Sequence, residues 1–189
     1  SPAEPQNRLH DEFAGKRRGP VEQHMTECSG GDWSPKFDGN LFWNQKVLLM
    51  ENFNNHGQSA IHWNLALDEN RGPRCEGGAC CATCRGVVTV NSTAEAADDL
   101  AYNVEFVGLA HHSSFVGRGA RRIFSEVSPE ASVHTVAYRN TDGTLVVVAV
   151  NDDLKKNVTL EVLADGESFL YDLVPGVVTF TWGHPEVLV

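Results

Sequence analysis

The sequence lacks a long apolar run and an excess of basic residues. No apolar stretch approaches the roughly 20 residues that a membrane-spanning helix needs, so we expect no transmembrane segment. Lysine and arginine number 15 against 25 aspartates and glutamates, which gives a formal net charge of −10. Because an acidic surface repels nucleic acids and anionic membranes, we expect neither as a partner.

The chain also lacks the features of an ordinary protein start. Residues 1–13 contain no initiating methionine, no basic segment and no apolar core of the kind that signal peptides have. We therefore expect the first residue to be the cut or truncated edge of a longer chain. The 189 residues that are present suffice for one large domain or two small ones.

Two strand patterns that end in polar residues are present in the first half. Residues 21–27 end at the carboxylate of Glu27, followed closely by a Ser-Gly-Gly turn, and residues 59–67 run into an acidic turn. An amphipathic helix is predicted between them over residues 41–53, and we expect its Trp43 to pack in the core. Strands joined in this way indicate neighbours in a parallel α/β sheet or barrel, where reactive side chains collect at the carboxyl ends.

Short β-rich runs follow Gly119, after a helix predicted over residues 98–115. They span residues 121–127, 132–139, 144–151, 157–163, 168–173 and 177–182. Asp142-Gly143 and Asp165-Gly166 are strong hairpin signals. Evenly spaced strands with such turns predict an antiparallel β-sandwich.

Four of the five cysteines lie close together: Cys75, Cys80, Cys81 and Cys84. A zinc site needs four thiolates that converge as a tetrahedron, and the cluster lacks the two separated pairs that support one. Disulfides need an oxidising compartment and would staple the loop, and free thiols are the third possibility. We favour disulfides and expect no metal; the connectivity stays open because four cysteines allow three pairings. Cys28 is left over, and we expect it to be a small buried filler.

Two N-glycosylation sequons, at Asn91 and Asn157, are compatible with secretion. Such triplets also occur by chance. With the disulfide hypothesis they favour a secreted or extracellular protein, and a lysosomal location is also open.

Three motifs carry a family resemblance. They are HMTECSG at residues 24–30, WNLALD at residues 63–68 with Gly72-Pro73, and the stretch from Ser114-Phe115-Val116 to Gly119-Ala120-Arg121-Arg122-Ile123. Together they resemble the C-terminal portion of glycoside hydrolase family 30, which includes glucosylceramidases and microbial β-1,6-glucanases. The resemblance extends from about Leu9 to Trp182.

The resemblance implies a fold and an activity. The fold is α/β plus all-β: the C-terminal strands and helices of a (β/α)8 TIM barrel over residues 1–118, then an antiparallel β-sandwich over residues 119–189. The activity is that of a retaining β-glycosidase acting by double displacement on a β-linked glucoside, polysaccharide or glycolipid, without a cofactor. Glu27 matches the position of the family's nucleophile, and Trp63 matches an aromatic residue that lines the sugar site. Trp33 and Asn64 are further candidates for substrate binding.

The chain departs from the family pattern at the second catalytic group. The family's general acid/base glutamate lies on an earlier strand in an Asn-Glu pair, and no such pair precedes Glu27. Asp68 or Glu69 could in principle supply the carboxyl group, but the resemblance places Asp68 in a structural turn. We therefore expect activity only from a full-length parent, with the missing N-terminal part of the barrel as a partner. The alternative is a non-catalytic carbohydrate-binding or structural β-sandwich module.

Overall fold

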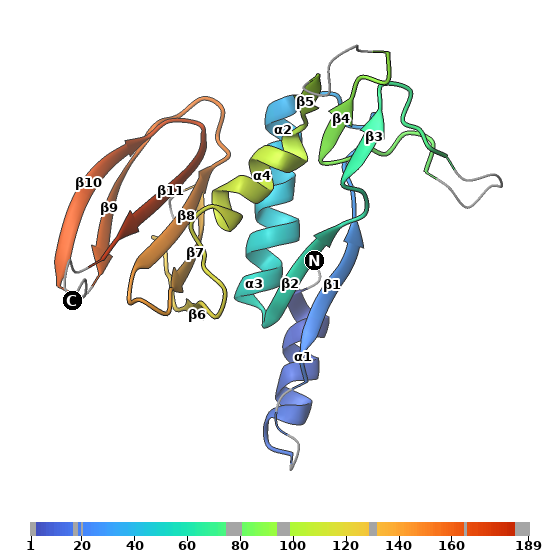
Figure 1. Ribbon diagram of the computed structural model, residues 1–189. Coiled ribbons are helices and arrows are strands. Elements are labelled where there is room, and N and C mark those ends of the chain that lie inside the picture. The colour runs from blue at the N-terminus through green and yellow to red at the C-terminus, as the bar shows by residue number, and fades with distance from the viewer. Residues whose placement is uncertain are drawn as a thin grey trace. The chain divides into compact units, whose positions relative to one another are not determined.

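A computed structural model gives the fold of the chain (Figure 1). It describes residues 3–16, 19, 21–74, 81–93, 99–128, 132–164 and 166–183. The chain divides into two compact units, Ser1–Ala110 (unit 1) and His111–Val189 (unit 2), and each is described by itself. Asp165 of a predicted hairpin and the first residue of the helix predicted over residues 98–115 lie outside the described residues.

A parallel pair of strands forms the centre of unit 1. β1 (Gln23–Cys28) pairs with β2 (Gly57–His62), and Cys28 lies opposite His62. Parallel neighbours need a crossover connection, and a continuous helical run supplies it. The run consists of α2 (Phe37–Trp43), η1 (Asn44–Met50) and α3 (Glu51–Asn54) (Figure 1). The parallel pair predicted from the sequence is therefore present.

The middle of this helical run is a π-helix, which changes the side chains that it buries. Asn44 and Gln45 are fully buried together with apolar residues, whereas Trp43 is 41% exposed. The buried amides of Asn44 and Gln45 donate to the carbonyls of Asn40 (3.0 Å) and Gly108 (2.7 Å). The prediction that Trp43 packs in the core is wrong, because the wider i→i+5 turn places the buried face elsewhere.

The strand predicted over residues 59–67 is two strands in the structure. β2 ends at His62, and β3 (Ala66–Asp68) begins after a turn. The side-chain oxygen of Asn64 accepts the Ala66 N–H at 3.1 Å, a bond typical of turns. β3 then pairs in parallel with β4 (Val88–Val90), and β4 pairs antiparallel with β5 (Leu100–Tyr102).

Two further helices belong to this part of the sequence. α1 (Ala3–Ala14) is joined to α3 by side-chain amides: Asn7 donates to Asn55 at 2.8 Å. α4 (Val104–Ser113) is shorter than the helix predicted over residues 98–115, because β5 precedes it. The Asn103 carbonyl accepts the Phe106 N–H at 3.0 Å, and the helix starts there.

Unit 2 consists of antiparallel strands in two sheets. The larger sheet has the order β11 (Gly176–Trp182), β8 (Leu145–Asn151), β7 (Val133–Arg139) and β6 (Arg121–Ile123). The second sheet is the hairpin of β9 (Val158–Ala164) and β10 (Glu167–Leu173) (Figure 1). These bounds agree closely with the predicted strands, except that the first ends at Ile123 rather than at residue 127.

Aliphatic side chains fill the space between these two sheets. Leu173 of β10 packs with Val133 of β7 and Ala149 of β8, and Val158, Val178 and Phe180 lie against them. Val146, Val148 and Val150 are also completely buried, on the face of β8 opposite to Ala149. The two sheets therefore share one core, as in the antiparallel β-sandwich expected for this part of the sequence. Gly143 closes the β7–β8 turn with a φ of +88°, a conformation that favours glycine and explains the Asp-Gly signal.

The contact between the sheets predicts a difference between two leucines of β10. Leu173 is 2% exposed and Leu170 is 73% exposed. We expect Leu173→Ala to lower the unfolding free energy of unit 2 by about 2–5 kcal/mol, because it leaves a cavity in the core. Leu170→Ala is the matched control and should change it by no more than about 0.5 kcal/mol. Urea unfolding followed by circular dichroism measures both, and equal losses would contradict the shared core.

The buried His112 predicts a pH dependence for unit 2. Its Nδ1 lies 3.1 Å from the Tyr138 hydroxyl, and burial, together with the neighbouring His111, lowers the pKa of His112 to about 4. The unfolded side chain has a pKa of about 6.5, so the stability contributed by neutral His112 is complete above that pH. We expect this stability to be lost as the pH falls from about 6.5 towards 4. Urea titrations across this window should fall less steeply for His112→Gln; an identical fall would contradict the assignment.

Candidate active site

Glu27 is the last residue but one of β1, and its side chain is exposed. The carbonyl of the next residue, Cys28, accepts the Trp63 N–H at 2.8 Å. This bond holds the end of β1 beside the turn that follows β2. In open α/β sheets, ligands bind at the carboxyl ends of parallel strands, which is where Glu27 lies.

Cys28, the residue after Glu27, has a thiol of low reactivity. Its thiol is half-buried, and burial is the main reason that the pKa of Cys28 is raised. The negative charge of Glu27 raises the pKa further, and a backbone hydrogen bond from Ser29 partly opposes these effects. A thiol reacts through its thiolate, so the raised pKa makes Cys28 less reactive than a free thiol.

Trp33 lies in the loop after β1 and presents an exposed ring. A Cβ atom on Gly31 would lie 2.1 Å from ring atom Cζ3 of Trp33, so only glycine allows the ring to lie there. The next residue back along the chain, Asp32, forms an ion pair with Arg71. Trp33 is 60% exposed, which leaves one large aromatic surface available for stacking.

Trp63 and Asn64 lie together in the turn between β2 and β3, and both are half-buried. The side-chain oxygen of Asn64 is used by the Ala66 N–H, and its backbone carbonyl accepts the Val87 N–H at 3.0 Å. Asn64 therefore has a structural role in the turn. The structure brings Trp63 to the strand end that carries Glu27 through the Cys28 hydrogen bond.

Neither Asp68, the last residue of β3, nor Glu69, which follows it, has the environment of a general acid. Asp68 accepts the N–H groups of Asn70 (2.8 Å) and Gly72 (2.6 Å), so it closes its own turn. Glu69 accepts the N–H and the hydroxyl of Ser92 at 2.9 and 2.7 Å, and these bonds lower the pKa of Glu69. A general acid needs a raised pKa, and hydrogen bonds to the charged form act in the opposite direction.

The cysteine cluster contains a disulfide between Cys81 and Cys84. Cys84 is buried, and the Ser29 hydroxyl donates to its sulfur at 2.9 Å. Because two of the four cysteines are joined to each other, the zinc site with four thiolates is contradicted. Cys75 and Cys80 lie outside the described residues.

A buried ion pair near this loop escapes the sequence analysis. Glu105 is 1% exposed and its Oε1 lies 3.1 Å from Nη2 of Arg85. His62, the partner of Cys28 across the sheet, is partly buried, and burial lowers the pKa of His62 while the charge of Glu105 opposes that shift. The sequence did carry a signal for this buried charge: Glu105 is the only charged residue in the otherwise apolar helical stretch VEFVGLA. Such a charge is buried only when it has a partner.

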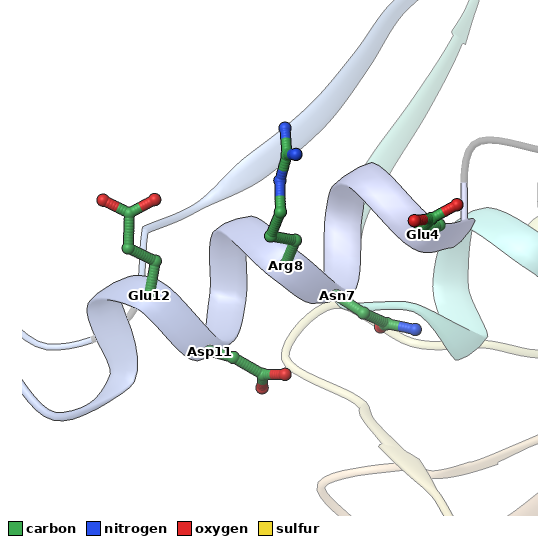
Figure 2. Close-up of a pocket in the computed structure, with 5 residues that line it drawn as sticks. All are labelled: Glu4, Asn7, Arg8, Asp11 and Glu12. Carbon is green, nitrogen blue, oxygen red and sulfur yellow. The ribbon is translucent and has the colours of Figure 1, made fainter.

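One further depression offers no binding site. It is shallow, lies on α1 and is lined by Glu4, Asn7, Arg8, Asp11 and Glu12, whose side chains project to different sides of the helix and do not converge on one point (Figure 2). A binding site needs convergent polar groups, which this surface lacks. Within the described ranges, no three His, Cys, Asp or Glu residues are placed to hold a metal ion.

Sequence comparisons relate the chain to known enzymes. Residues 119–180 match the model of the glycosyl hydrolase family 30 beta sandwich domain. An endo-1,6-β-D-glucanase of Aspergillus fumigatus is 30% identical over 149 residues, which are 75% of this chain and 28% of that protein. The chain is related to glycoside hydrolase family 30. Another relative, the lysosomal acid glucosylceramidase of Mus musculus, is 28% identical over 160 residues, or 76% of this chain and 29% of that protein.

Solved structures agree with the family-30 relationship. An endo-β-1,6-glucanase with 32% identity superposes with a TM-score of 0.82 over 96% of this chain and 39% of that one. SrfJ from Salmonella typhimurium has a TM-score of 0.78 at 22% identity, covers 95% of this chain and 38% of that one, and supports the fold alone. The chain spans about a third of the length of the curated relatives. None of the helices within the described ranges has the length and apolar character to cross a membrane.

The hydrogen bonds of Asp68 predict that it stabilises this family-30 chain structurally. We expect Asp68→Ala to lower the unfolding free energy of unit 1 by about 1–3 kcal/mol, because two N–H groups lose their acceptor. Asp11→Ala is the control, because Asp11 is exposed on α1 and its loss should leave the Asn70 and Gly72 amides unchanged. Hydrogen exchange of the Asn70 and Gly72 amides measures the effect locally. Unchanged exchange in Asp68→Ala would contradict the role.

Proposed function

We propose that this chain is part of a retaining β-glycosidase in which Glu27 is the nucleophile. The observation that carries the proposal is the exposed carboxylate at the carboxyl end of a parallel strand, within the HMTECSG motif. The relationship to glycosidases supports the chemistry: the curated relatives are endo-1,6-β-glucanases and a glucosylceramidase. We infer a β-linked glucoside as substrate, either a polysaccharide or a glycolipid.

The proposed mechanism is a double displacement. Ionised Glu27 attacks the anomeric carbon and forms a glycosyl-enzyme, while a second carboxyl group protonates the leaving oxygen. Water then releases the sugar, with the second group acting as base. In retaining enzymes the two carboxyl groups lie roughly 5–5.5 Å apart. Asp68 is bonded within its own turn and Glu69 is bonded to Ser92, so we infer that the acid/base comes from outside this chain.

We further propose that residues 1–118 complete a (β/α)8 barrel with a missing N-terminal part. The parallel β1–β2 pair with its helical crossover is the unit from which such barrels are built. Ile61 and Leu65 are 52% and 75% exposed, as expected of side chains that neighbouring barrel elements would cover. Residues 119–189 form the second domain of this proposal.

Two tryptophans are the proposed sugar-binding residues. Trp33 offers an exposed ring in the loop after Glu27, and Trp63 lies at the neighbouring strand end. An aromatic ring can stack on the apolar face of a pyranose, and the indole N–H of a tryptophan remains able to donate a hydrogen bond. Asn64 is the weaker candidate, because its side-chain oxygen is used by the turn. No cofactor is needed for this reaction.

An oxidising compartment suits the proposed enzyme. The Cys81–Cys84 disulfide favours a secreted, extracellular or lysosomal protein, and one relative is named as lysosomal. Asn91 is a proposed glycosylation site, and the Thr93 hydroxyl of its sequon donates to the Asn91 side chain at 2.8 Å. Asn157 is exposed in the loop before β9 and is the second proposed site.

A non-catalytic carbohydrate-binding or structural module is the second candidate. It is favoured by one observation: Asp68 and Glu69, the two residues considered for the second carboxyl group, are both held in structural hydrogen bonds. Both candidates predict sugar binding through tryptophans, and only the first predicts a covalent bond to Glu27.

Hydrolysis rates of an aryl β-glucoside test the proposal, measured for the 189-residue chain and for the full-length parent enzyme. We expect the isolated 189 residues and their Glu27→Gln variant to give equal background rates, because retaining hydrolysis needs two carboxyl groups. The full-length parent should be active, and Glu27→Gln should abolish its activity. A fluorinated glycoside should label the parent at Glu27. Labelling at any other residue would refute the nucleophile assignment, and an inactive, unlabelled parent would favour the non-catalytic module.

A further inference from the structure

The loop that follows Glu27 is bonded to a distant segment of the chain. We call residues 29–32 the nucleophile loop and residues 81–85 the clamp. The Asp32 N–H donates to the Thr83 carbonyl at 3.0 Å, and the Arg85 N–H donates to the Gly30 carbonyl at 2.9 Å. Gly31 and Cys84 form an antiparallel bridge between these two bonds. The clamp therefore adds a short stretch of sheet to the backbone just beyond Glu27.

The buried ion pair ties the clamp to α4. Arg85 Nη2 lies 3.1 Å from Glu105 Oε1, and the side chains are 19% and 1% exposed. A carboxylate buried to this degree depends on its partner, because removal of one member leaves an uncompensated buried charge. The pair thus fixes the clamp at its last residue, directly where the Arg85 N–H bonds Gly30.

Gly30 allows the carboxylate to lie against the nucleophile loop. A Cβ atom at this position would lie 1.8 Å from Glu105 Oε1 and 2.9 Å from Arg85 Nη2. Both charged groups therefore occupy the space that a side chain on the loop would fill. Three elements meet at Gly30 for this reason: the nucleophile loop, the clamp and the first turn of α4.

A single contact joins the two charges. Within the described part of the chain, Arg85 Nε and Glu105 Oε2 have no hydrogen-bond partner. No second bond can compensate when the contact between Nη2 and Oε1 is lost. A lysine at position 85 can reproduce one contact of this kind, whereas an uncharged residue cannot.

We propose that Arg85 and Glu105 are positioning residues for Glu27: their ion pair holds the clamp on the nucleophile loop and so fixes the end of β1. Neither residue contacts the sugar in this proposal. The functional meaning rests on Glu27 as the nucleophile, whereas the physical coupling between ion pair and loop does not.

Hydrogen exchange of the full chain tests the coupling. In Glu105→Gln we expect the amides of Asp32 and Arg85 to exchange faster by on the order of a hundredfold, as loss of a buried ion pair implies. The side-chain carboxyl carbon resonance of Glu27 should shift in the same variant. Amides of β8 in unit 2 should keep their wild-type exchange, which separates a local effect from general unfolding.

Three control variants distinguish positioning from packing. Glu12→Gln breaks the exposed pair of Glu12 with Lys16, at 3.3 Å, and should leave the Asp32 and Arg85 amides unchanged. Arg85→Lys keeps the charge and should stay within about threefold of wild-type exchange. Arg85→Met keeps most of the apolar stem, loses the charge, and should exchange as fast as Glu105→Gln.

The outcomes decide the proposal whether or not the chain turns over a substrate. Wild-type exchange and an unmoved Glu27 resonance in Glu105→Gln would overturn it, as would equal exchange in Arg85→Met and Arg85→Lys. If Glu105→Gln fails to fold, the comparison of the two Arg85 variants still decides. None of these readouts needs catalysis, so failure to label Glu27 with a fluorinated glycoside is a separate result.

Discussion

The parallel pairing of β1 with β2 is the contact on which the candidate site depends. It sets Cys28 opposite His62 and brings the Trp63 N–H to the Cys28 carbonyl. The pairing in turn requires the helical crossover, whose buried Leu48, Leu49 and Met50 hold it in place. The position of an exposed carboxylate is therefore determined by a core that lies behind it.

The two units achieve their order by different means. The core of unit 2 is mainly aliphatic, and its central strand β8 is buried along most of its length. Unit 2 also buries Asn151 and His112, whereas unit 1 buries several amides and a carboxylate: Asn40, Asn44, Gln45, Asn52 and Glu105 are all nearly inaccessible. Buried polar groups gain little net free energy but cost much when unpaired. Unit 1 therefore specifies its geometry through directional hydrogen bonds more than unit 2 does.

The sequence alone predicts the strands of unit 2 well, because each strand is separated from the next by a turn of clear chemistry. Asp142-Gly143 is an example, since the glycine adopts a positive φ there. The parallel strands of unit 1 are also predictable from their polar ends. Trp43 was misplaced because amphipathic periodicity assumes a regular α-helix, and η1 departs from it. The break at Asn64 depends on one side-chain hydrogen bond inside an apolar pattern, so strand periodicity does not reveal it.

Some residues of the candidate site could be predicted from the sequence and others could not. Sequence motifs point to Glu27, Trp63 and Asp68, because the local backbone of each motif places them. The pair of Arg85 and Glu105 joins residues 20 positions apart across two elements, and its significance depends on their meeting at Gly30. Contacts of this kind come from tertiary packing, which spacing along the chain does not encode.

The π-helix described above has a consequence for how this part of the chain can vary. A regular α-helix turns by about 100° per residue, so one residue inserted or removed rotates everything on one side of the change relative to the other. η1 takes up such a mismatch within a single segment, Asn44–Met50, while the strands before and after the crossover stay paired. A one-residue change of length in this helix can therefore leave the paired strand ends in place while an exposed ring such as Trp43 turns in a different direction.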